Sequence, residues 1–97
     1  MVKRRVVTND VLLRVSMADQ VLSMWMTANK KYEITPEDCM SLLVERNIYE
    51  YDRNNRGHYF REDLRTLRDN NQLNLFTDLI IEQKAPGLRW YIRAKSS

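Results

Sequence analysis

The spacing of apolar residues changes from helical to alternating near residue 72, and this change limits the folds that the chain can adopt. Before it, Phe60, Leu64 and Leu67 recur at i, i+4 and i+7, which places them on one face of a helix. We therefore predict a helix over residues 58–71. After it, apolar and polar residues alternate as they do in a strand with one buried face. The pattern indicates an α+β protein.

Residues 74–95 are predicted to form a C-terminal β-hairpin. Pro86 and Gly87 lie between the two alternating segments and suit the central positions of a type II turn. In the second strand the expected inner face is apolar, and it comprises Leu88, Trp90 and Ile92. The expected outer face comprises Arg89, Tyr91 and Arg93.

A second stripe runs along the predicted helix at 58–71. Arg61, Arg65 and Arg68 are each displaced by one position from the apolar stripe, so they lie about 100° around the helix from it. An arginine face of this kind is typical of a helix that binds nucleic acid. It is equally typical of a surface helix whose charges serve solubility, and the spacing alone does not decide between the two.

Two further helices are expected in the first half of the chain, over residues 10–29 and 36–47. Thr35 is a good N-cap and Pro36 suits the first helical position, so the start of the second helix is well defined. A short strand is expected between the two helices, near residues 30–34. Residues 1–8 are expected to form a basic arm, with a short strand over residues 2–7 as the alternative.

Charge is unevenly distributed along a chain of 97 residues with a net charge of +3. Residues 1–32 contain six basic and two acidic residues, residues 33–55 contain two and six, and residues 56–97 contain eight and five. Basic ends around an acidic middle suit a protein with one face directed toward an anion. The length indicates a single domain over residues 1–97.

The composition favours a reduced, cytoplasmic protein that is not an enzyme. Cys39 is the single cysteine, and there is no run of about 18 apolar residues that would span a membrane. Cys39 lies in an apolar run, where an inert buried thiol is expected, and His58 is the only histidine, so no metal cluster is apparent. The adjacent acids at 37–38 and 62–63 do not face each other on a helix. We expect no catalytic residue, no metal and no cofactor.

The order helix, short strand, helix, turn, helix and hairpin resembles a winged helix-turn-helix domain, and the resemblance covers residues 10–95. The local signals that carry it are Thr35-Pro36-Glu37-Asp38 and Phe60-Arg61-Glu62-Asp63-Leu64-Arg65. The resemblance implies that the third helix enters the major groove and that the hairpin is the wing. Carried over by position, the recognition helix holds Arg61, Arg65 and Arg68, and the wing holds Lys84, Arg89 and Arg93. The link at residues 47–57 is longer than in most such domains, which leaves the docking angle of the third helix open.

The resemblance implies sequence-specific binding of double-stranded DNA by a small transcription regulator located at the nucleoid, with a homodimer as one expected state. Secondary candidates for DNA contact are Arg56, His58 and Tyr91. The alternative is a protein–protein adaptor that binds or inhibits host machinery, like small accessory proteins of phages or plasmids, because this fold alone does not specify DNA binding. RNA binding ranks last.

The regulator interpretation carries a condition. It requires the arginine stripe to point outward beside the basic hairpin, not to be held in ion pairs with neighbouring carboxylates.

Overall fold

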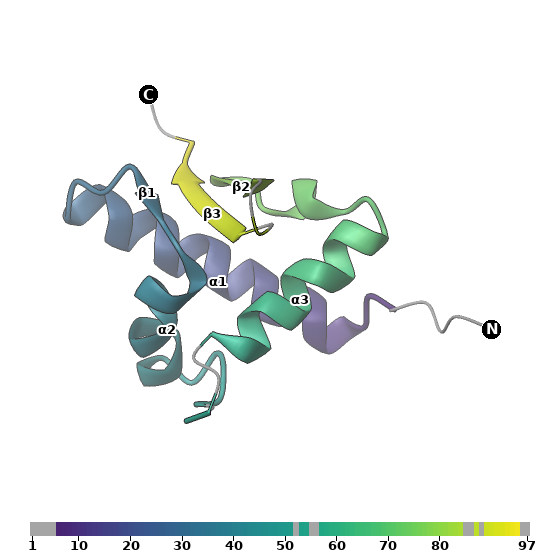
Figure 1. Ribbon diagram of the computed structural model, residues 1–97. Coiled ribbons are helices and arrows are strands. Elements are labelled where there is room, and N and C mark those ends of the chain that lie inside the picture. Colours follow the sequence, from purple (N-terminus) through teal and green to yellow (C-terminus); the bar gives the residue numbers. More distant parts are fainter. Residues whose placement is uncertain (1–5, 52, 55–56, 85–86, 88, 96–97) are drawn as a thin grey trace.

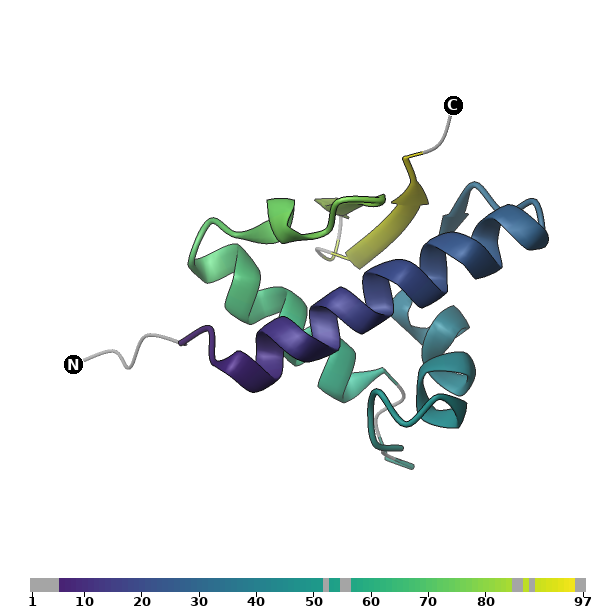
Figure 2. The same ribbon diagram turned by 180° about the vertical axis from the view of Figure 1, so that it is seen from behind.

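Three helices cover one face of a three-stranded antiparallel sheet in the computed structural model of the protein (Figure 1). The structure describes residues 6–51, 53–54, 57–84, 87 and 89–95. The elements in chain order are α1 (Asn9–Ala28), β1 (Glu33–Ile34), α2 (Pro36–Glu45), α3 (His58–Asp69), the 3₁₀ turn η1 (Leu73–Leu75), β2 (Leu79–Lys84) and β3 (Arg89–Ala94). Figures 1 and 2 show, from opposite sides, the sheet lying on one side of the crossed helices α1 and α3.

The helix ends follow from local chemistry. Thr35 caps the start of α2 and Pro36 occupies the first helical position, as the sequence predicts, and Asp38 completes a reciprocal capping box with Thr35. Gly57 precedes α3 with φ +82°, and Asn71 follows it with φ +56°. Both residues adopt the left-handed conformation, which glycine enters without a Cβ clash and asparagine tolerates.

The sheet has the order β1-β3-β2, so the middle strand is the last one in the chain. Strands β2 and β3 pair from Leu79↔Ala94 to Lys84↔Arg89, and β1 adds two residues to the other edge of β3. This α+β architecture is compatible with a winged-helix layout, in which the β2–β3 hairpin follows the third helix directly. Gly87 has φ +79°, as a type II turn requires at its third position, while Ala85, Pro86 and Leu88 lie outside the described residues.

The core forms where the three helices and the sheet meet. The predicted apolar stripe of α3 is confirmed, because Phe60, Leu64 and Leu67 have no solvent exposure. Trp90 and Ile92 of β3 are buried against the helices, while Arg89 and Arg93 are exposed, which confirms the predicted inner and outer faces at these positions. Within the described residues, no helix combines the length and apolar character needed to cross a membrane.

The predicted helix boundaries, 10–29, 36–47 and 58–71, differ from those of α1, α2 and α3 by one or two residues at each differing end. The predicted hairpin, by contrast, starts too early. Residues 74–78 are not strand, because η1 and a turn precede β2 at Leu79. The cause lies in α1, where the buried Asp19 carboxylate accepts hydrogen bonds from the Thr77 amide and hydroxyl and from the Asp78 amide. These bonds hold the segment outside the strand ladder.

The link between α2 and α3 is long because α2 ends at Glu45 and does not continue through Tyr49, while α3 begins only at His58. Its first part is anchored by Ile48 and Tyr49, which are both about 5% exposed. The first part of the link is therefore anchored to the core before α3 begins.

Candidate nucleic-acid interface

The structure brings together arginines from two elements that are far apart in the chain. Arg61 and Arg65 of α3 and Arg89 of β3 line one hollow of about 480 Å³, together with residues from the start of α2. Arg68 lies beside them, because its guanidinium donates to the Gln83 side chain, 3.0 Å away, and lies 5.8 Å from the ring centre of Trp90. We call the surface formed by Arg61, Arg65, Arg68 and Arg89 the arginine face.

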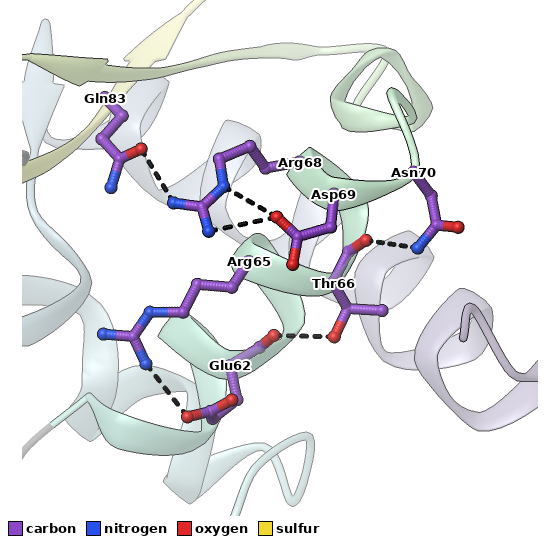
Figure 3. Close-up of polar contacts among 7 residues, drawn as sticks. All are labelled: Glu62, Arg65, Thr66, Arg68, Asp69, Asn70 and Gln83. Carbon is purple, nitrogen blue, oxygen red and sulfur yellow. Dashed lines mark hydrogen bonds and ion pairs between the residues drawn. The ribbon is translucent and has the colours of Figure 1, made fainter. Parts of the chain in front are cut away.

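Three of these arginines form ion pairs. Arg61 pairs with Glu37 at the start of α2. Arg65 pairs with Glu62 one turn earlier in α3, at 3.0 Å. Arg68 pairs with Asp69, at 3.1 Å, and Figure 3 shows the last two pairs together with the bond to Gln83. Arg89 forms no ion pair within the part of the chain that the structure describes.

The other two predicted wing residues do not line this hollow. Lys84 and Arg93 lie on the same face of the sheet as Arg89, since Lys84 is the cross-strand partner of Arg89 and Arg93 is four residues farther along β3. Lys84 pairs with Glu33 at 3.3 Å and lies 4.9 Å from the ring centre of Tyr91, and Arg93 pairs with Glu82. Lys84 and Arg93 are therefore engaged by other carboxylates and lie outside the lining of the hollow, although Lys84 is next to Arg89 across the strands.

The secondary candidates are dispersed. His58 is the first residue of α3, and its ring meets that of Tyr59 edge-on at 5.1 Å. Tyr91 lies on the outer face of the sheet under Lys84. Arg56 lies outside the described residues.

The condition set for a DNA reader fails on pairing, because Arg61, Arg65 and Arg68 are all held in ion pairs with carboxylates, and holds only on position. The α3 arginines do lie on the side of the molecule that also presents Arg89. The α3 arginines are ion-paired, however. Three carboxylates neutralise three of the four guanidinium groups, so the four arginines and their carboxylate partners together have a formal charge of +1. The ion pairs are partly exposed, with side-chain exposures of 18% for Arg61, 38% for Arg65 and 40% for Arg68. Pairs at such exposure are worth about 0–1 kcal/mol each, so phosphate groups can replace the carboxylates at small cost.

The opposite side of α3 carries a polar network that the sequence analysis missed. Asp63 is 7% exposed and accepts two hydrogen bonds from Arg14 of α1, at 2.8 and 3.0 Å, and one from the Tyr49 hydroxyl at 2.7 Å. The hydrogen bonds to Asp63 raise the pKa of Arg14, and burial raises the pKa of Tyr49. The network joins α1, the link and α3, and so fixes the rotation of α3 that points its arginines away from the core.

No local signal reveals this network, because Arg14 and Asp63 are 49 residues apart. Elsewhere, the Cys39 thiol is buried as expected, and burial raises its pKa. Among the residues that the structure describes, no group of three or more His, Cys, Asp or Glu side chains is placed to hold a metal ion.

A scan against protein-family models finds no match to this chain, and searches of curated proteins and of solved structures find none either.

Proposed function

We propose that the protein binds double-stranded DNA through the arginine face, as a small winged-helix regulator that acts at the nucleoid without a cofactor. The observation that carries the proposal is the shared hollow, where Arg61 and Arg65 of α3 meet Arg89 of the hairpin. Guanidinium groups grip phosphate oxygens, and they also pair with both acceptors of a guanine edge in the major groove. A helix and a hairpin that present arginines on one side suit a groove and its flanking backbone.

The ion pairs set the strength expected of this binding. Each phosphate that contacts Arg61, Arg65 or Arg68 must displace a carboxylate, so the arginine face attracts DNA less strongly than four unpaired arginines would. Each phosphate contact made by a basic side chain releases about one counterion, which makes affinity fall as salt rises. We therefore expect modest affinity that is measurable at low salt and is lost steeply as salt increases.

The test is a fluorescence-anisotropy titration of a labelled duplex of mixed sequence at several salt concentrations. The variant Arg61→Gln/Arg65→Gln/Arg89→Gln removes three charges from the arginine face. The matched control, Lys30→Gln/Lys31→Gln/Arg46→Gln, removes three charges from exposed positions in the α1–β1 turn and at the end of α2. We expect the first variant to lose at least tenfold in affinity and the control to lose far less. Equal losses would refute the assignment of the face.

A protein partner is the second candidate, and a specific observation favours it. The arginine face alternates basic and acidic side chains, since Glu37, Glu62 and Asp69 are interleaved with the arginines. Mixed charge of this kind suits the polar rim of a protein interface and repels the uniformly negative DNA backbone in part. The adaptor interpretation requires no duplex binding at low salt, together with a stoichiometric protein partner that survives nuclease treatment. That partner must be lost in the Arg61→Gln/Arg65→Gln/Arg89→Gln variant.

The regulator proposal includes a homodimer, because paired half-sites on DNA are commonly bound by two copies of one protein. Leu13 and Met24 on the outer side of α1 are 61% and 73% exposed and offer apolar surface to a second copy. Sedimentation equilibrium distinguishes the two states, since it gives either the chain mass of 11.7 kDa or twice that value.

A further inference from the structure

Among the carboxylates of the arginine face, Glu37 has a distinct origin. Glu62 and Asp69 belong to α3 itself, three residues and one residue away from the arginines that they contact. Glu37 comes from α2, 24 residues away from Arg61 in the chain. It also lines the same hollow as Arg61, Arg65 and Arg89. Its carboxylate therefore reaches into the candidate DNA site from outside the recognition helix.

The backbone around Glu37 is held firmly. The capping box of Thr35 and Asp38 fixes the first turn of α2. The Cα of Gly57 lies against the same turn, since a Cβ at Gly57 would lie 3.5 Å from the Glu37 amide nitrogen and 3.4 Å from the Pro36 carbonyl carbon. The ion pair thus costs little ordering of the main chain. Arg61 is in turn the least exposed of the three paired arginines.

We propose that Glu37 is a built-in competitor that occupies the phosphate position at Arg61 and so weakens sequence-independent binding to DNA. This inference rests on the proposed function. A carboxylate and a phosphate present similar pairs of acceptor oxygens to a guanidinium group. DNA must displace Glu37 before Arg61 can contact a phosphate, and after displacement the negative charge of Glu37 remains near the backbone. Glu37 therefore lowers the affinity that phosphate contacts contribute to binding on DNA of any sequence.

The experiment compares Glu37→Gln with Glu45→Gln in duplex titrations at several salt concentrations. Glu45 lies at the other end of α2, is exposed and forms no ion pair within the described residues, so its variant makes the same change in net charge without touching Arg61. We expect Glu37→Gln to tighten binding to a mixed-sequence duplex about three- to tenfold and to steepen the salt dependence by about one counterion. Glu45→Gln should change affinity less than twofold. Circular dichroism melts check that both variants fold.

A double-variant cycle identifies the partner of Glu37. In an Arg61→Gln background the gain from Glu37→Gln should disappear, because there is no guanidinium left to release. If the gain persists there, or if Glu45→Gln gives the same gain, Glu37 acts only through net charge and the inference is overturned while DNA binding stands. If no protein in the set binds duplex at low salt, both the inference and the proposed function fail.

Discussion

The variant Asp63→Asn tests the claim that the network behind α3 holds the helix in place. Asp63 is 7% exposed and is the common acceptor for Arg14 and Tyr49. The asparagine amide keeps the size of the side chain but removes its charge and one of its two acceptor atoms. The variant therefore leaves Arg14 without a charged partner, and one of the donors without an acceptor.

The magnitude follows from the burial of the two partners. Breaking a fully buried ion pair by removing one charge costs about 3–5 kcal/mol, because the remaining charge is stranded. Here Arg14 is 35% exposed and regains part of its hydration, which brings the expected cost down to about 2–3 kcal/mol. For a domain of this size, each kcal/mol lowers the melting temperature by about 4–8 °C, so a fall of roughly 10–20 °C is expected.

The assay is urea unfolding followed by tryptophan fluorescence, with a thermal melt alongside. Asp69→Asn is the matched control, because Asp69 is an α3 carboxylate that pairs with an arginine at the surface. Its expected cost is below about 1 kcal/mol. If the two variants are equally stable, the network does not hold α3, and the reasoning about its orientation is refuted.

Three further variants or probes test the fold. Leu64→Ala should lower the free energy of unfolding by about 2–5 kcal/mol and Leu13→Ala by well under 1 kcal/mol, since Leu64 is fully buried and Leu13 is mostly exposed. If urea titrations give the two variants similar losses of unfolding free energy, the assignment of Leu64 to the core is contradicted. Gly57→Ala and Gly87→Ala should each destabilise by about 1–2 kcal/mol, because both glycines have positive φ, while a Cβ would meet only ordinary van der Waals contacts at Gly57 and open space at Gly87; unchanged melting temperatures would contradict the left-handed conformation at these two positions. Cys39 should resist a thiol reagent in the folded protein and react in urea, since burial raises its pKa. Because the thiol pKa is raised in the folded protein, the buried protonated thiol contributes stability below the unfolded thiol pKa of about 8.5. This contribution is lost as pH rises above that value.

Much of the fold could be predicted because its signals are local. The start of α2 follows from Thr35 and Pro36, whose roles depend on neighbours within one turn. The buried face of α3 follows from its 3.6-residue period, and the faces of β3 follow from alternation. The predicted strand over residues 74–78 was wrong, since an alternating pattern there is overridden by the hydrogen bonds that the Asp19 carboxylate, 58 residues earlier than Thr77, accepts from this segment. No pattern within a short window contains that information.

The candidate site also combines features that follow from local sequence with features that depend on tertiary packing. That Arg61, Arg65 and Arg68 lie off the buried stripe of α3 follows from spacing alone. The partners of these arginines differ in kind, because Glu62 and Asp69 are near in sequence whereas Glu37 is brought to Arg61 only by the packing of α2 on α3. That Arg89 lines the hollow while Arg93, on the same face of β3, lies outside it also depends on how the end of the hairpin lies against the helices. Whether a stripe of arginines is available to a ligand is therefore a tertiary property.

The central claim is that DNA contacts the arginine face, and amide chemical-shift mapping of the ¹⁵N-labelled protein during titration with a duplex tests it most directly. We expect the largest shifts in His58–Asp69 of α3, at Gly87 and Arg89 of the hairpin, and at Glu37, with saturation at low salt and reversal on adding salt. Shifts concentrated on the exposed side of α1, or no shifts at low salt, would contradict the account.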